Sequence, residues 1–380
     1  MTKLKLILLL FFIGLVVLVI RCREPFEASV SSSKIRILIV DGYINAGPGQ
    51  TVIRLSRATP LGESQSMDYE RNATVSIVDS ENQEYILTES SDGMYTSGEL
   101  NLPIENEYKL KIVVEGAEEY HSTSLPVKVT PPIDSISWEW TKSLDIYANA
   151  HDAESKTHYY MWTYQEDWEI RSAYKSLLMW DDTVKPRPPP ETNQMFICWK
   201  SAKSKGLIFE STSSLTSDKM KFLLKQIAHA AERTSWKYAI TVTQHTLDEP
   251  EYDYLKLMEK NTQQVGSFFD PMPSQLYGNI ENIKQPDETV IGYVGVYTTV
   301  TKRLFILNSE LPSSPRGSSC PTRSIEQLNK DSVAKYVESG LYIPTGTFLK
   351  GLESTPWMTI MVTPCLDCRV YGTTVRPDFW

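Results

Sequence analysis

The amino-acid sequence predicts a mainly β protein, in which an N-terminal Ig-like β-sandwich precedes a second β-rich domain with a few inserted helices. Three observations predict this fold class. Short β-branched runs separated by turn residues follow one another over residues 35–130. Beyond residue 131, further strand-like runs are rich in aromatic residues. Apolar residues recur at helical spacing in only three segments.

In the first domain we expect about seven short strands, because β-branched and aromatic residues alternate with polar ones between turns. The first strand, residues 35–40, should end at the turn signal Asp41-Gly42. The proline pair in Thr130-Pro131-Pro132 should mark the end of this domain. The other strands are expected at residues 51–55, 73–78, 85–88, 94–96, 107–114 and 120–129.

The second domain is expected over residues 131–310, with residues 311–380 as a cysteine-containing segment packed against it. The proline run from Pro186 to Pro190 predicts a surface loop. One helix is predicted after Pro250, and another from Ser324 to the residue before Gly340. The third segment, residues 217–228, fits a helix or a strand equally well.

Residues 1–21 are typical of a secretory signal peptide. Their apolar run of fifteen residues, Leu6 to Ile20, would span roughly 22 Å as a helix, short of the ~30 Å hydrocarbon core of a bilayer. Cys22 follows where bacterial lipoproteins are cleaved and acylated, so we expect lipidation there and a tether over residues 22–34. Because Arg21 is unusual before a lipidated cysteine, an uncleaved anchor is the alternative. Both interpretations place the rest of the chain outside the cytoplasm.

The charge balance bears on the partners of the chain. It has 38 Lys and Arg residues against 47 Asp and Glu residues, a formal net charge of −9. Such a protein is repelled by nucleic acid, and no basic run follows the signal segment. We therefore expect no nucleic-acid partner.

The four remaining cysteines, Cys198, Cys320, Cys365 and Cys368, are even in number, and an exported chain meets an oxidising compartment. Two disulfides are the simplest interpretation, with three pairings open. The Cys365-x-x-Cys368 spacing also resembles a redox or half-zinc motif. The surrounding sequence lacks the βαβ pattern or second ligand pair that those sites need.

Reaction machinery is hard to find in this sequence. It contains no nucleophile-elbow, zinc-protease or phosphate-binding motif, and we expect no enzyme, no cofactor and no metal. His151, Asp152 and His158 could offer metal ligands, but solvated loop residues are the preferred interpretation. Glycosidases need two carboxylates that flank a bond. The candidates lie among tryptophans and are Glu139, Glu166 and Asp167.

A recognition surface is the more conservative hypothesis for the aromatic segments. Aromatic side chains dominate both cores and interfaces, so a buried core is its alternative. A proline-containing loop from Asp270 onward leads to Tyr277-Gly278-Asn279, and a rigid loop suits recognition. The candidate recognition residues are Trp162, Trp168, Tyr277 and Asn279.

Several segments together resemble a family of Bacteroidota outer-membrane lipoproteins described as domain of unknown function 4249. The resemblance covers nearly the whole chain. It rests on residues 22–27, 39–45, 92–95, 132–136, 198–199, 238–247, 277–280, 291–293, 365–369 and 377–380.

The resemblance implies a lipid anchor in the outer membrane and a role beside a TonB-dependent, SusC-like transporter, with no catalytic residues to carry over. Glu24 and Glu27 resemble acidic tags for surface display, which favours the cell surface over the periplasmic face. We expect a non-catalytic accessory or substrate-binding lipoprotein, held to the membrane by lipid on Cys22, with a glycan or peptide ligand. The alternatives are a surface glycan hydrolase and a structural envelope protein or adhesin.

Overall fold

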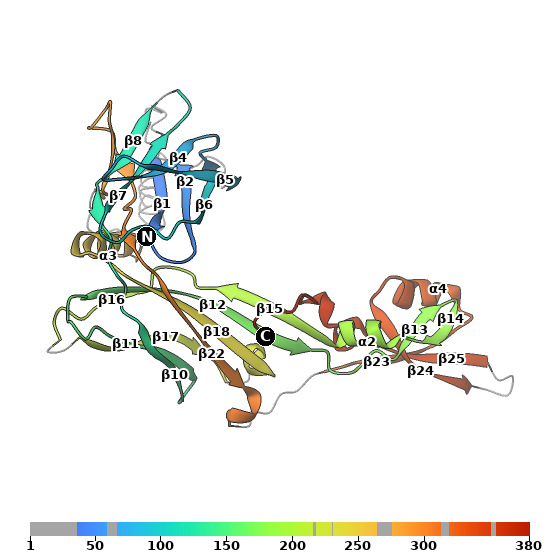
Figure 1. The fold of residues 1–380 in the computed structure, drawn as a ribbon. Helices are drawn as coiled ribbons and strands as arrows, with labels where there is room; N and C mark the ends of the chain where they lie inside the picture. Colours follow the sequence, from blue (N-terminus) through green and yellow to red (C-terminus); the bar gives the residue numbers. More distant parts are fainter. Residues whose placement is uncertain are drawn as a thin grey trace, which may run out of the picture.

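The computed structural model describes residues 36–58, 67–116, 118–215, 218–229, 231–263, 276–312, 319–350 and 355–380. The predicted signal segment, the tether and Cys22 lie outside these residues. Figure 1 confirms the mainly β fold class, with an N-terminal β-sandwich, a second sandwich and a smaller lobe at the far end. Among the described helices, none has both the length and the apolar character that crossing a bilayer requires.

The first sandwich forms because its strands alternate apolar and polar residues. In β7, Tyr108, Leu110 and Ile112 are fully buried, while the residues between them face outward. Strands β19, β8, β7 and β4 form one layer and β6, β2, β1 and β20 the other, and β5 pairs with both β4 and β6. The consecutive strands are β1 Leu38–Asn45, β2 Gln50–Arg57, β3 Asp68–Tyr69, β4 Thr74–Asp79, β5 Glu84–Ser91, β6 Met94–Glu99, β7 Glu107–Val113, β8 Glu119–Ser122 and β9 Leu125–Pro126.

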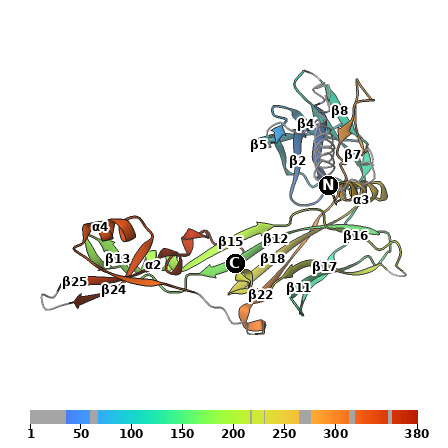
Figure 2. The same cartoon turned by 180° about the vertical axis from the view of Figure 1, so that it is seen from behind.

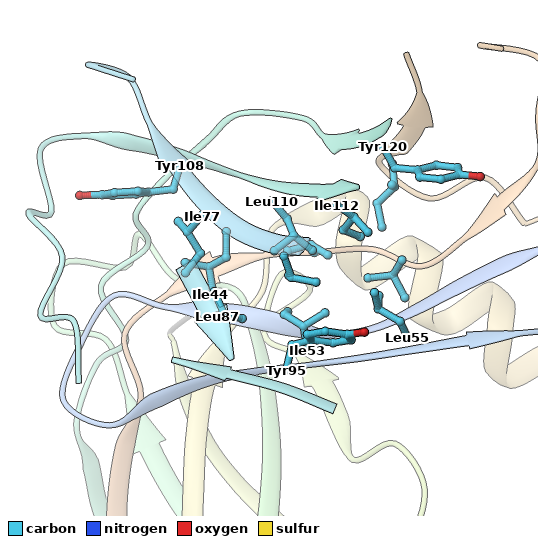
Figure 3. Close-up of a cluster of buried hydrophobic side chains, with 14 of the residues drawn as sticks. Ile44, Ile53, Leu55, Ile77, Leu87, Tyr95, Tyr108, Leu110, Ile112 and Tyr120 are labelled. Carbon is cyan, nitrogen blue, oxygen red and sulfur yellow. The ribbon is translucent and has the colours of Figure 1, made fainter. Parts of the chain in front are cut away.

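The two layers enclose a single apolar core, shown in Figure 3. Side chains from both layers meet there, and each fully buried large side chain contributes roughly 1.5–3 kcal/mol. The members labelled in the figure are Ile44, Ile53, Leu55, Ile77, Leu87, Tyr95, Tyr108, Leu110, Ile112 and Tyr120.

The turn predicted at Asp41-Gly42 is wrong, because β1 continues through it to Asn45. Gly42 pairs with Ile53 at a φ of 136°, and a Cβ atom there would lie 2.3 Å from the Val52 carbonyl oxygen. The glycine allows two strands to approach closely rather than ending one.

Three short strands from much later in the chain complete the first sandwich. They are β19 Ile280–Asn282, β20 Val290–Ile291 and β21 Val296–Tyr297. Strand β19 pairs with β8, while β20 and β21 both run parallel to β1. The predicted boundary, which assigned all of residues 131–310 to the second domain, is therefore wrong. Parallel pairing to a distant strand leaves no local turn signal in the sequence.

A second sandwich packs a three-stranded sheet against a five-stranded one. Trp162 of β12 and Phe222 of β17 stack between the sheets with ring centroids 4.9 Å apart. The three-stranded sheet has β10 Ile133–Trp140, β11 Leu144–His151 and β17 Lys219–Ile227, and the five-stranded sheet has β12 Tyr159–Arg171, β15 Ile197–Lys203, β16 Phe209–Ser211, β18 Lys237–Thr246 and β22 Val300–Leu307.

The ambiguous segment 217–228 is a strand where it is described, because β17 pairs along its length with β11. A register shift between Ile146 and Tyr147 lets the pairing continue past an irregularity. The helix predicted after Pro250 is confirmed as α3 Glu249–Gln263. Two 3₁₀ turns flank this sandwich, η1 Glu232–Thr234 and η2 Asn308–Glu310.

The distal lobe combines two distant stretches of chain around its own small core. Its β13–β14 hairpin and helix α2 come from within the second predicted domain, so residues 311–380 alone do not form it. Its elements are β13 Leu178–Asp181, β14 Thr183–Pro186, α2 Pro189–Phe196, β23 Thr322–Glu326, α4 Lys330–Val333, the π-helical turn η3 Ala334–Glu338, β24 Tyr342–Lys350, β25 Thr355–Val362, and the 3₁₀ turns η4 Thr363–Cys365 and η5 Cys368–Val370.

Two predictions in this lobe are wrong. The proline run is not all loop, because Pro189 and Pro190 begin α2, where their missing N–H groups cost nothing. The helix expected from Ser324 begins only at Lys330, capped by the Asn329 side chain. Ser324 itself lies in β23, which pairs with β25.

Two disulfides join the lobe and the second sandwich to the last part of the chain. Cys198 of β15 is bonded to Cys368, and Cys320 to Cys365, which selects one of the three pairings left open by the sequence. The first closes 170 residues and the second 45 residues. Cys365 and Cys368 thus have different partners, so they do not form the mutual disulfide of a redox Cys-x-x-Cys motif.

Removal of the long-range disulfide should destabilise the protein more than removal of the short-range one. In the chain-entropy description the difference is about 1 kcal/mol, within a total of about 2–5 kcal/mol for each bond. C198S/C368S should therefore have a lower urea midpoint than C320S/C365S, and both should fall below the oxidised wild type. The reverse order, or two unchanged midpoints, would contradict this prediction.

Candidate functional site

A cleft of about 820 Å³ lies where the two sandwiches meet. One wall is the linker between the sandwiches, residues 128–132, and another is the loop that joins β11 to β12, residues 151–159. The end of β18 and the start of α3 provide Thr246, Leu247 and Glu249. In Figure 1, α3 lies beneath the first sandwich and beside this junction. A cleft of this volume at a domain interface suits a small ligand.

Hydrogen bonds hold the linker wall in place. The Gln244 amide donates to the Pro131 carbonyl over 2.9 Å, and its oxygen accepts from the Trp162 indole N–H over 2.8 Å. The Thr246 backbone N–H donates to Thr130 Oγ1 over 3.1 Å. Gln244 is fully buried, and both ends of its amide are satisfied, so it joins the second core to the linker.

The loop wall is organised by Asp152. Its carboxylate accepts from the backbone N–H groups of Glu154, Lys156 and Thr157 at 2.9–3.0 Å. Burial opposes ionisation, but these donors outweigh it and lower the pKa of Asp152. The loop is therefore a preformed part of the cleft.

Behind the cleft, the His245 ring is enclosed by two tyrosines from the first sandwich. Its centroid lies 4.4 Å from that of Tyr297, nearly parallel, and 5.0 Å from that of Tyr43. Neither ring nitrogen has a hydrogen-bond partner among the described residues. Burial lowers the pKa of His245 to about 3, so the imidazole is neutral in this packing.

A second buried titratable group, Glu251 of α3, lies close to the same aromatic cluster. A Cβ atom on Gly295 would be 2.5 Å from Glu251 Oε2 and 2.7 Å from a Tyr297 ring carbon. Burial, followed by the nearby charge of Asp248, raises the pKa of Glu251 well above its usual range. Asp248 accepts from the Tyr293 hydroxyl at 3.1 Å. The junction thus contains a neutral histidine and a carboxyl group that favours its protonated form.

Trp162 and Trp168 do not form a recognition surface, which corrects the sequence-based hypothesis. Trp162 is 0% exposed and Trp168 is 6% exposed, and both belong to the core of the second sandwich. Their indole N–H groups donate to Gln244 and Glu232. The alternative interpretation of these aromatics as core holds.

Tyr277 and Asn279 lie on the segment that returns to the first sandwich. Tyr277 is 74% exposed and is available to a partner. Asn279 instead fastens the segment, because its side chain accepts from the Val294 N–H and donates to the Val294 carbonyl. Between them, a Cβ atom on Gly278 would be 1.6 Å from the Gly292 oxygen, so only glycine fits there. The part of the predicted loop before residue 276 lies outside the described residues.

The carboxylates considered for glycoside hydrolysis do not converge. Glu166 and Asp167 are neighbours in β12, so their side chains point to opposite faces of the sheet. Glu166 faces Lys225 at 3.3 Å and Arg233 at 3.1 Å and accepts from the Tyr238 hydroxyl. Such a pair cannot flank one glycosidic bond.

The other two groups from the sequence also have local partners. Asp167 accepts from Ser201 and Gln165. The third hydrolase candidate, Glu139, pairs with Lys221 at the surface. These contacts are those of structural side chains.

The histidines suggested as metal ligands lie at the cleft but do not converge. His151 pairs with Asp134 at 2.7 Å, and Asp152 is occupied by its own loop. Within the described part of the chain, no group of three or more His, Cys, Asp or Glu side chains could hold a metal ion.

Sequence reasoning missed His245 and Glu251. His245 lies in a β-branched run and Glu251 in the first turn of a helix, positions that are ordinary for both residue types. His245 lies on the face of β18 opposite to the core residues Tyr238 and Ile240, and it is buried by Tyr43 and Tyr297 of the first sandwich, so the strand pattern carried no signal for it.

Comparison with known proteins gives a family but no described activity. The model of the family described as domain of unknown function 4249 matches residues 23–303. A solved structure of the FN1–FN3 domains of chicken CNTN1 is 14% identical, with a TM-score of 0.18. The match covers 55% of this chain and 59% of that one, and the similarity is too low to bear on fold or function. No curated protein matches the chain.

The free energy of unfolding should decrease in acid because of His245. Its pKa is about 3 when folded and about 6.5 when unfolded, so stability is complete above pH 6.5 and falls toward pH 3 by about 1.4 kcal/mol per unit. Glu251 acts in the opposite direction, because its raised pKa stabilises the fold in acid. Replacing His245 alone isolates the first effect.

We expect H245F, measured by urea unfolding from pH 4 to pH 7, to lose less stability in acid than the wild type. His158 is an exposed histidine, and H158N is the matched control that should follow the wild type. An acid dependence that H245F leaves unchanged would contradict this assignment.

Proposed function

The chain belongs to the family described as domain of unknown function 4249, and we propose that it is a non-catalytic outer-membrane lipoprotein displayed at the cell surface. In this proposal it serves a TonB-dependent, SusC-like transporter as an accessory or substrate-binding partner. The observation that carries this proposal is the preformed junction cleft, with a mixed polar and apolar lining. Such a lining suits binding of a glycan or peptide.

The roles of the carboxylates support binding rather than hydrolysis. Glu166 is taken up by two cations and a tyrosine, and Asp152 by its own loop. A hydrolase would instead need two free carboxyl groups on either side of one bond. The charged groups that remain at the cleft, such as Lys128 and Glu249, suit ligand orientation.

The N-terminal sequence supports membrane attachment. An apolar run followed by Cys22 is typical of a lipoprotein signal, and a cysteine that carries two or more acyl chains gives stable anchoring. The exposed Tyr277 suits contact with a membrane partner, because amphipathic aromatic residues are enriched at protein interfaces.

The anchor can be tested by mass spectrometry of the N-terminal peptide. We expect an acylated Cys22 and a membrane-bound protein in the wild type, and loss of both in C22A. An intact Met1 end, with C22A still bound to the membrane, would favour the uncleaved anchor.

The partner can be tested by affinity purification from native membranes in mild detergent. We expect a TonB-dependent barrel to copurify with the wild type and to be reduced several-fold with Y277A. The matched control is Y174A, which removes another exposed tyrosine, 54% exposed, in the chain that leads to the distal lobe. Absence of a barrel from the wild-type eluate would refute the transporter role.

A further inference from the structure

A band of alternating cations and aromatic rings crosses the outer face of the five-stranded sheet, the face turned away from the three-stranded sheet. Strand residues next to it, such as Ile170, Tyr238 and Ile306, point inward to the core, which places the band on the opposite face. We call this set the cation–aromatic band; its members are Lys175, Phe196, Arg171, Trp236, Lys237, Phe305, Trp380, Phe379 and Arg303.

One half of the band is built around Arg171 at the end of β12. Its guanidinium lies 4.0 Å from the centroid of the Trp236 ring and 6.0 Å from that of Phe196. The Lys175 ammonium lies 5.2 Å from Phe196. Trp236 is still 43% exposed, so much of its surface stays open to solvent.

The other half joins β18 and β22 to the C-terminal residues, which Figure 2 shows beside this sheet. Lys237 lies 4.5 Å from the Phe305 ring and 4.6 Å from the Trp380 ring. Arg303 stacks 3.4 Å from the Phe379 ring. Phe305 remains 38% exposed, and the attraction between each cation and its ring helps to hold both side chains in place.

The charge of the band differs from that of the whole chain, which is −9. Arg171 pairs with Glu169, but no carboxylate of the described residues lies within 4.0 Å of Lys175, Lys237 or Arg303. Three cations without acidic partners, set among exposed rings, form a surface for an anionic ligand that also has apolar faces.

We propose that the cation–aromatic band binds an acidic polysaccharide. The exposed rings would stack on the apolar faces of the sugars, while Lys175, Lys237 and Arg303 pair with the sugar carboxylates. The flat face of a sheet, with neighbouring strands about 4.8 Å apart, suits an extended chain that crosses several strands.

The surroundings of the band favour a narrow ligand over a broad anionic surface. Asp378 is exposed next to Phe379 of the band, and Glu310 is exposed on the turn that follows β22. An anionic bilayer or a large acidic protein face would be brought against these carboxylates, whereas a single polysaccharide chain can contact the band alone. The band is separate from the junction cleft and does not depend on the transporter role.

The test is binding of the full-length protein, in mild detergent, to polygalacturonate. Its methyl ester serves as the uncharged ligand with the same backbone. We expect the acid form to bind and the ester to bind at least ten-fold more weakly. K237Q/R303Q should weaken binding to the acid at least ten-fold and reduce its salt dependence, and W236A should weaken it several-fold with the salt dependence kept.

The matched control is K142Q/K219Q, which likewise removes two positive charges, here from exposed lysines away from the band, and should bind as the wild type does. Near-ultraviolet circular dichroism checks the fold, and R303Q alone, at an exposed position, serves if the double variant is unfolded. Equal binding by K237Q/R303Q and the control would overturn the proposal. So would equal affinity for the ester, for polyglutamate or for phosphatidylglycerol vesicles.

Discussion

The pairing of the linker with the returning chain is the constraint on which the arrangement of the two sandwiches depends. The Lys128 N–H donates to the Val296 carbonyl, and the Thr298 N–H donates back to the Lys128 carbonyl, each over 3.0 Å. The Thr130 N–H donates to the Thr298 hydroxyl, and the Thr130 hydroxyl donates to the Thr298 carbonyl. The first sandwich is complete only when the chain has passed through much of the second, so the two share one set of backbone bonds and the cleft between them has fixed walls.

This constraint also explains the unusual interior of the junction. Pairing of β21 with β1 brings Tyr297 beside Tyr43, and the end of β18 then places His245 against both rings. An imidazole left without hydrogen bonds costs roughly 1–3 kcal/mol, which the aromatic packing has to offset. His245 and the buried Glu251 together make this junction sensitive to protonation.

The sequence predicted what local patterning controls and missed what distant pairing controls. Alternation along β7 and the turns between strands were sufficient to predict the first sandwich. The sequence could not predict that the strands from β19 to β21 return to the first sandwich. Strands of two or three residues carry no pattern, and these strands pair with partners more than 150 residues away. In the distal lobe, Ile325 and Val333 fit one helical spacing, yet a strand contributes the first and a helix the second to the same core.

The candidate site was harder to predict for a related reason. The sequence pattern around a tryptophan in a strand is the same whether its side chain faces a core or a ligand. Only the packing of β17 over β12 shows that Trp162 is buried in the core. The cation–aromatic band is scattered over five parts of the chain, so no single window of sequence contains it.

The long-range disulfide helps to position the C-terminal residues of this band. Cys368 is bonded to Cys198 of β15, and five residues later the backbone of Thr373 pairs with Trp199. These two attachments set the course of the last residues across the sheet, where Phe379 and Trp380 meet Arg303 and Lys237. The positions of Phe379 and Trp380 thus depend on a covalent bond of a kind that persists in oxidising environments. A reduced chain would keep the cations of β18 and β22 but lose the fixed position of Phe379 and Trp380, so the proposed binding by the band depends on this bond.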